Sequence, residues 1–239
     1  MAHYLEHKMF DTKEGNALQE LAANGASPNA FTSNAITGYY FESTEKFEEN
    51  LRILLSFVSI PYFTKESVDK EQGIIGQEIG MIEDDPDWVV FMDLMQALYE
   101  KHPVRVSVAG SAESISHITA ETLYACHKAF YDPSNMVLCV AGDVDPEKIC
   151  QAAREILPER PGAPVARGDY GAQEPAEVCQ PMIQREMEVS VPLFQLGFKG
   201  EAAPEGEGAL RQQLLGELAC EALLGNSGPL YARLYREGL

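Results

Sequence analysis

The sequence has little positive charge for its size. Only 18 lysine and arginine residues stand against 37 aspartate and glutamate residues, giving a formal net charge of -19 at pH 7. This balance argues against a nucleic-acid backbone or an anionic membrane surface as partner, because both would repel an acidic protein. The charge is compatible with attraction of basic peptides, but a simple contribution to solubility is the favoured interpretation.

The sequence also lacks long apolar runs and paired cysteine motifs. No run approaches the roughly 20 residues that a membrane-spanning helix needs, and the first residues show no basic-then-apolar signal pattern. The cysteines are odd in number and have no C-x-x-C spacing, which is typical of reduced thiols with a packing role. They are Cys126, Cys139, Cys150, Cys179 and Cys220. We therefore expect a cytoplasmic protein with no membrane partner.

What is present is the composition of a folded chain. With 239 residues and 45% hydrophobic content, it can bury a sizeable core in one large or two smaller domains. A stretch rich in Pro, Gly and Ala at 158–182 predicts a linker. We expect a first domain at 1–157 and a second at 183–239, which has only begun when the sequence stops.

The periodicity of apolar residues predicts a mixture of helices and strands. A hairpin is expected from Ala30–Ser33 and Thr37–Glu42, and further strands at 135–144 and 182–200. Apolar residues recur at helical spacing in four other segments, 44–59, 119–131, 145–158 and 205–224. A further turn and helix are expected in the last segment, 225–239. Because helices and strands do not alternate strictly, the fold class is α+β, an antiparallel sheet packed with helices.

The segment AHYLEH at the start of the chain places His3, Glu6 and His7 on one face of a helix. Two imidazoles at this spacing can bind one tetrahedral zinc ion, and a carboxylate beside them can take a proton from metal-bound water. H-x-x-E-H is the inverzincin order of these residues. A chance pattern on a solvated helix is the alternative, since such a motif needs structural context.

A third ligand is expected on the helix that begins after Thr64, a plausible N-cap. On this helix Glu71 and Glu78 are two turns apart and lie among isoleucines. A carboxylate on a buried face is costly unless it is paired or binds a metal. The acidic run at 83–87 brackets Pro86, where the helix should break, and is expected to be a solvated helix end.

The other histidines are weaker ligand candidates. None of them has a second histidine at metal-binding spacing, so surface or capping roles are favoured. They are His102, His117 and His127.

Five segments follow one another along the chain: AHYLEHKMF, NGASPNAFTSNAITGYYFEST, KEQGIIGQEIGMIEDDPDW, HPVRVSVAGSAESISHIT and FYDPSNMVLCVAGDVDPEK. Together they resemble the pitrilysin/insulinase family of zinc metallopeptidases, most closely its bacterial processing-peptidase-like branch. The resemblance covers nearly the whole chain. It implies a metallopeptidase domain of this type followed by the start of a second, similar domain.

The resemblance also implies roles for individual residues. His3, His7 and Glu78 would be the zinc ligands, with Glu6 the general base and Glu71 a further acidic residue beside the metal. The reaction would be hydrolysis of a peptide bond by zinc-activated water. The strand containing Asn29, Ala30 and Phe31 would hold an extended peptide by main-chain pairing, although an ordinary core hairpin is an equal alternative for Phe31.

The sequence departs from the family pattern at its ends. Family members carry strands before the motif helix, whereas here Met1 stands two residues before the first ligand, so a fragment truncated at both ends is expected. A zinc endopeptidase is the leading function. The alternatives are a non-catalytic subunit of the same fold, in a homodimer or a heterodimer with a related subunit, and an unrelated acidic interaction protein.

Overall fold

The computed structural model describes residues 1–157 and 173–238. The chain forms two compact units, Met1–Gly197 and Phe198–Leu239. Most of the predicted linker lies outside the described residues, and its last part, 173–182, forms neither helix nor strand. The boundaries expected for the two domains stay a prediction.

The predicted hairpin is confirmed as the β-structure of the first unit. Strands β1 (Ser27–Thr32) and β2 (Thr37–Glu42) pair antiparallel, in a register that runs from Ser27 opposite Glu42 to Thr32 opposite Thr37. Among the described residues these two strands form the only sheet. Helices surround them, so the α+β class with an antiparallel sheet is also confirmed.

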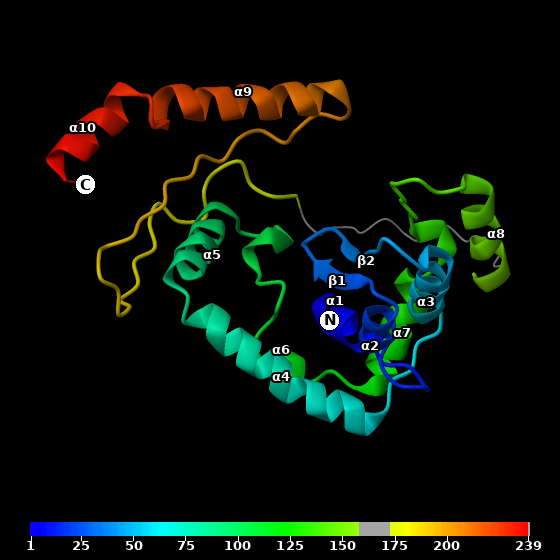
Figure 1. Cartoon of the computed structure of the whole chain (residues 1–239). Helices are drawn as coiled ribbons and strands as arrows, with labels where there is room; N and C mark the ends of the chain where they lie inside the picture. Colours follow the sequence, from blue (N-terminus) through cyan, green and yellow to red (C-terminus); the bar gives the residue numbers. More distant parts are fainter. Residues whose placement is uncertain (158–172, 239) are drawn as a thin grey trace. The chain divides into compact units, whose positions relative to one another are not determined.

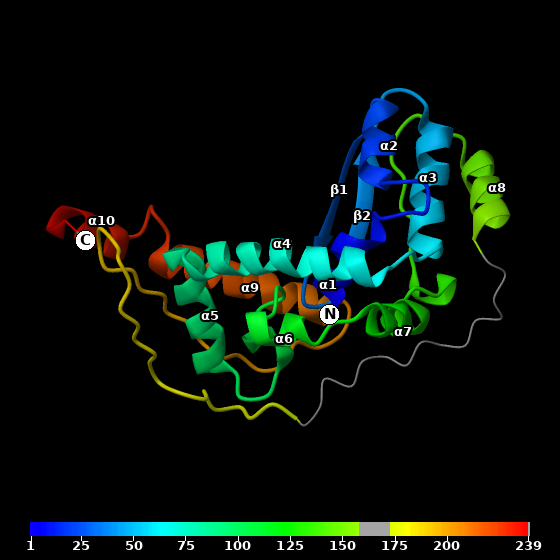
Figure 2. The same cartoon turned by 90° about the horizontal axis from the view of Figure 1, so that it is seen from below.

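Five helices of the first unit lie where the sequence predicted them, and the helices at 17–23, 86–98 and 112–116 were not predicted. Figures 1 and 2 show α1 against both the hairpin and α4, and α2 and α3 beside the hairpin. Their bounds are α1 Ala2–Met9, α2 Ala17–Ala23, α3 Phe47–Ser59, α4 Lys65–Glu83, α5 Pro86–Leu98, α6 Ala112–Ser116, α7 Ala120–Phe130 and α8 Pro146–Ile156, with short 3-10 turns η1 Pro103–Arg105 and η2 Pro133–Asn135.

Helix α4 begins and ends where the sequence signals indicated. The Thr64 hydroxyl accepts a hydrogen bond from the Ser67 amide, and the Thr64 amide donates one to Ser67 Oγ, completing a capping box. The helix ends at Glu83, and Pro86 opens α5 as its first helical residue. The acidic run between them is exposed, as expected for a solvated helix end.

One apolar core joins α1 to the elements around it. Tyr4, Leu5 and Met9 of α1 are buried against residues of α3, α4 and α7. The Tyr4 hydroxyl donates a hydrogen bond of 2.6 Å to the carbonyl of Val68 on α4. The core therefore fixes the position of α1 relative to α4. In this arrangement the polar faces of the two helices lie against each other.

Two strand predictions are wrong. Residues 135–144, expected to be a buried strand, form no ladder, and Val137 is 93% exposed. Residues 182–200 are likewise extended but unpaired, with Phe194 86% exposed. A strand needs a neighbour for its backbone groups, and no described strand lies beside either segment.

The second unit is helical. Helix α9 spans Glu207–Leu224 and α10 spans Pro229–Glu237, which confirms the helices expected there. Gly238 closes α10 with a positive φ of 78°, a conformation that suits glycine. Along α9, Leu210, Leu214 and Leu218 recur every four residues and are exposed.

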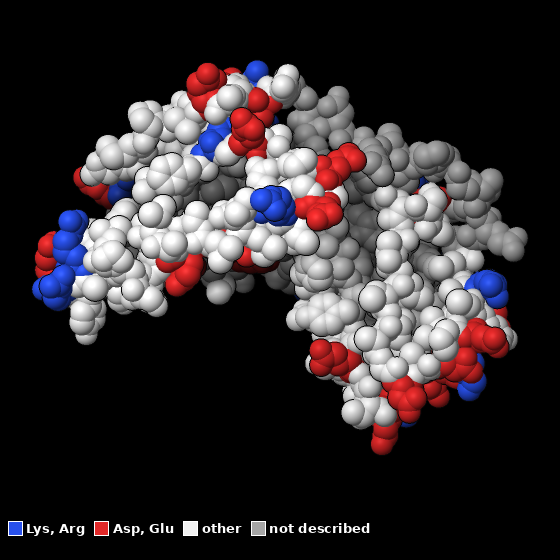
Figure 3. Space-filling view, turned by 90° about the horizontal axis from the view of Figure 1, so that it is seen from above, with Lys and Arg blue, Asp and Glu red and all other residues white. Residues whose placement is uncertain are grey.

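The exposure of the cysteines and the character of the helices test two further expectations. All five cysteines are free thiols as predicted, but the packing role is wrong for four of them, because only Cys126 is partly buried. In the described parts of the chain, no helix has both the length and the apolar character that crossing a membrane requires. Figure 3 shows the acidic side chains of one face in separate groups divided by uncharged residues.

Candidate metal centre

Helix α1 carries the H-x-x-E-H motif as predicted. The apolar residues of the helix lie on the side opposite to the two histidines. With Tyr4, Leu5 and Met9 in the core, the side chains of His3 and His7 project together from one turn of the helix. Their ring centroids lie 4.7 Å apart with an interplanar angle of 69°. The two imidazoles therefore face the same small volume.

Helix α4 brings Glu78 to this volume. Glu78 Oε1 lies 3.4 Å from His3 Nε2, and Glu78 Oε2 lies 3.5 Å from His7 Nε2. One ligand atom from each of His3, His7 and Glu78 can be chosen so that all lie within 4.8 Å of one another. Two imidazole nitrogens and one carboxylate oxygen are a donor set that zinc accepts in catalytic sites, so the residues present fit this metal.

Glu71, two helical turns before Glu78 on α4, contacts His7 from the other side. Its Oε1 lies 3.1 Å from His7 Nδ1. When Nδ1–H donates to this carboxylate, the lone pair of the ring is on Nε2, the nitrogen that faces Glu78. The contact therefore sets both the tautomer and the orientation of His7.

The surroundings shift the pKa values of the two histidines in opposite directions. Burial lowers the pKa of His3, which favours the neutral ring that a metal requires. The hydrogen bond that His7 donates to Glu71 raises the pKa of His7, so a proton and a metal compete for that ring. Nδ1 of His3 is buried and, within residues 1–157 and 173–238, has no hydrogen-bond partner.

Glu6 is held apart from the ligand set. Its side chain is only 8% exposed, and Oε2 accepts a hydrogen bond from the hydroxyl of Thr32, the last residue of β1. A carboxylate with one oxygen engaged in this way has a fixed orientation beside the histidines. Sequence reasoning missed Thr32, whose signal was its place one residue after the expected substrate strand.

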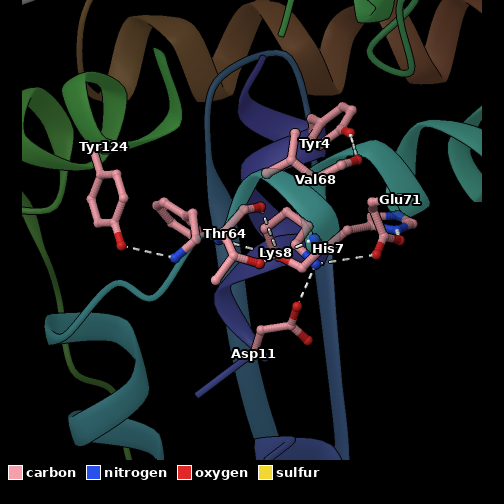
Figure 4. A network of polar contacts seen from close by, with 10 residues as sticks. Tyr4, His7, Lys8, Asp11, Thr64, Val68, Glu71 and Tyr124 are labelled. Carbon is pink, nitrogen blue, oxygen red and sulfur yellow. Dashed lines mark hydrogen bonds and ion pairs between the residues drawn. The ribbon is translucent and has the colours of Figure 1, made fainter. Parts of the chain in front are cut away.

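Lys8 and Asp11 were also missed. Lys8 is 2% exposed, and its ammonium contacts Asp11 Oδ2 and lies 3.5 Å from Glu71 Oε2. Figure 4 shows the contacts of Lys8 with both carboxylates, next to the contact of Glu71 with His7. The sequence signal for Lys8 was its helical position. It lies four residues after Tyr4 and three after Leu5, so it falls on the same side of α1 as these buried residues.

Asn29, Ala30 and Phe31 lie on β1, close in sequence to Thr32. They pair with Tyr40, Tyr39 and Gly38 of β2. Asn29 is exposed and Phe31 is 47% exposed. The hairpin therefore connects the expected substrate strand to the residue that holds Glu6.

The other histidines lie outside the cluster. His102 caps η1 by accepting a hydrogen bond from the Val104 amide, and His117 is exposed at the end of α6, which agrees with the expected roles. His127 differs from its expected surface role. It is 3% exposed, its Nε2 lies 3.0 Å from the Val58 carbonyl, and it packs on Tyr131.

Comparison with known proteins identifies the family. A model described as "Insulinase (Peptidase family M16)" matches residues 1–112, and one described as "Peptidase M16 inactive domain" matches residues 117–239. The chain belongs to peptidase family M16. The resemblance drawn from the motifs is therefore confirmed, and the His3, His7 and Glu78 cluster lies entirely within the first match.

Individual relatives agree with this assignment. The chain is 42% identical over 242 residues to "Uncharacterized zinc protease YmfH" of Bacillus subtilis, a match that covers all of this chain and 56% of the relative. It is 27% identical over 207 residues to "Probable mitochondrial-processing peptidase subunit beta, mitochondrial" of Arabidopsis thaliana, covering 84% of this chain and 39% of that protein.

A solved structure shows the same architecture. The crystal structure of a putative M16-like peptidase from Alicyclobacillus acidocaldarius matches with a TM-score of 0.81 and 34% identity. The match covers all of this chain and 56% of that one. The chain therefore spans about half the length of such relatives.

Proposed function

We propose that this chain forms the metal-binding half of a zinc endopeptidase, with His3, His7 and Glu78 as the ligands of one zinc ion. The convergence of these three side chains from α1 and α4 is the observation that carries the proposal. Bound there, zinc would polarise a peptide carbonyl and lower the pKa of a coordinated water. The names of the relatives as zinc proteases support the same metal.

Glu6 is the proposed general base. It comes from the same helical turn as the two histidines, and its Oε2 accepts a hydrogen bond from the Thr32 hydroxyl, which orients the carboxylate and leaves Oε1 to accept a proton. The carboxylate takes a proton from the attacking water and passes it to the departing amine. Glu71 would orient His7 and take no direct part in the proton transfer.

The substrate is proposed to be an extended segment of a peptide or unfolded protein. Asn29, Ala30 and Phe31 lie on β1, whose end holds Glu6 through Thr32. Main-chain pairing with an extended peptide along this strand would place a peptide bond near the base. The negative charge of the chain would favour basic peptides.

A non-catalytic or partner-dependent subunit is the second candidate. Two observations favour it: residues 117–239 match a domain described as inactive, and one relative is named as a subunit of a processing peptidase. The presence of both histidines, Glu6 and Glu78 favours the catalytic role, because a purely structural subunit has no need of this set. A homodimer or a heterodimer with a related subunit fits either candidate.

The test separates metal binding from chemistry. Zinc content is measured by elemental analysis, and cleavage of an unstructured peptide mixture is assayed in the full-length protein. We expect Glu6→Gln to retain zinc and lose cleavage by about 10²–10⁴-fold, whereas His7→Ala loses both. Glu83→Gln, at the exposed end of α4, is the control and should change neither. Normal cleavage by Glu6→Gln would refute the assigned mechanism, and absence of zinc from the wild type would refute the metal site.

A further inference from the structure

Lys8 is a buried ammonium directly after the second histidine of the motif. Its side chain is 2% exposed, and a lysine is almost never buried to this extent without a specific partner. Burying an ammonium costs several kcal/mol unless nearby anions compensate it. Lys8 therefore needs an explanation beyond helix formation, for which an apolar residue would serve equally well.

Two carboxylates compensate this charge, and they come from different segments of the chain. Asp11, three residues further along the chain, contacts Nζ and connects Lys8 to the loop that follows α1. Glu71 Oε2, from α4, lies 3.5 Å from the same nitrogen. The ammonium therefore connects the end of α1 to the middle of α4 at the level of the metal cluster.

The contact with Glu71 completes a relay of side chains. Glu71 has one oxygen at 3.1 Å from His7 Nδ1 and the other at 3.5 Å from Lys8 Nζ. A carboxylate engaged at both oxygens cannot rotate to offer a different lone pair to His7. Lys8, Glu71 and His7 are therefore linked in series through the two oxygens of one carboxylate (Figure 4).

We propose that Lys8 is a positioning residue of the metal centre, acting on His7 through Glu71. This inference rests on the proposed function, since it assumes that His7 is a ligand. Lys8 also places its ammonium against two carboxylates, those of Asp11 and Glu71. A stabilising ion pair that only closes α1 against Asp11 is the competing explanation.

Zinc affinity of this 239-residue chain tests the proposal without any need for catalysis. Competition with a chromogenic chelator gives the affinity, and circular dichroism reports the fold. We expect Lys8→Met to weaken zinc binding about tenfold, the lower end of the effect of residues that orient metal ligands. Lys8→Arg, which keeps the charge, should recover part of this loss. Lys8→Gln replaces Lys8→Met if the latter does not fold.

Two comparisons separate positioning from stability. Asp11→Asn removes the other partner of the same ammonium, so a purely structural role predicts that it weakens zinc binding in line with its loss of stability. The proposal predicts a change of no more than about twofold, because Glu71 is still held. In a Glu71→Gln background, Lys8→Met should likewise add no more than about twofold, because the relay is already broken.

Substitution of Co²⁺ for zinc adds a spectroscopic readout, since its visible absorption reports ligand geometry. We expect a changed spectrum for Lys8→Met and an unchanged one for Asp11→Asn. Unaltered zinc affinity in folded Lys8→Met, or an equal loss with and without Glu71, would overturn the inference while leaving the metal site intact. A wild-type chain that binds neither ion would overturn the proposed function and this inference together.

Discussion

At the scale of single residues, the three glutamates of the site differ in the residues that they contact. Glu78 faces both histidines, Glu71 faces only His7, and Glu6 is held by Thr32. Three glutamates with different partners can have three different roles in a small volume. The spacing of the motif identified Glu6, and the places of Glu71 and Glu78 among isoleucines identified the other two. Their partners follow from contacts across 26 residues, from Glu6 to Thr32, and 64 residues, from His7 to Glu71.

The hydroxyl of Thr32 should matter for catalysis and not for metal binding. Thr32→Val keeps the shape of the side chain but removes the donor to Glu6, so the base loses its fixed orientation. We expect cleavage by the full-length protein to fall by about 10-fold with zinc content unchanged. Thr44→Val is the matched control, because Thr44 is exposed and lies just beyond the end of β2. Equal effects of the two substitutions would mean that Thr32 acts through the hairpin.

At the scale of elements, the site depends on the packing of α4. Glu71 and Glu78 are in place because Val68, Ile75 and Ile79 on the neighbouring side of α4 are buried in the core shared with α1. The polar and apolar faces of one helix are thus coupled, and a change in packing should reach the metal ligands.

Two adjacent isoleucines provide a controlled test of this coupling. Ile75 is fully buried, whereas Ile74 is 46% exposed. Ile75→Ala should destabilise the chain by about 2–5 kcal/mol through loss of burial and creation of a cavity, and should also weaken zinc binding. Ile74→Ala should cost less than about 1 kcal/mol. Urea unfolding gives the free energies, and similar values for the two variants would contradict the packing described here.

The elements also show what could be predicted from the sequence. Helices α3, α4, α7 and α8 were predicted because periodicity, caps and proline act within a few residues. The strands at 135–144 and 182–200 were predicted wrongly, because a strand exists only with a neighbour and pairing is not local. Lys8 and His127 were misjudged or missed for the same reason, since burial of a polar side chain depends on partners distant in sequence.

At the scale of the whole molecule, the two compact units differ in their buried core and in their candidate metal ligands. The unit Met1–Gly197 contains the core and the metal cluster, and the unit Phe198–Leu239 consists of α9 and α10 with exposed apolar residues. No candidate metal cluster is found among the described residues of the second unit. A metal ion should therefore stabilise the two units unequally.

Removal of zinc tests this difference. A ligand that binds only the folded state stabilises it by about 2.7 kcal/mol when its free concentration is 100 times Kd. For a chain of this size, addition of a strong chelator should then lower Tm by roughly 5–10 °C. Glu78→Gln should abolish this shift and the control Glu83→Gln should retain it. Hydrogen exchange should locate the lost protection in α1 and α4, with α9 and α10 unchanged. Equal loss of protection in both units would mean that zinc stabilises the chain through contacts outside the His3, His7 and Glu78 cluster.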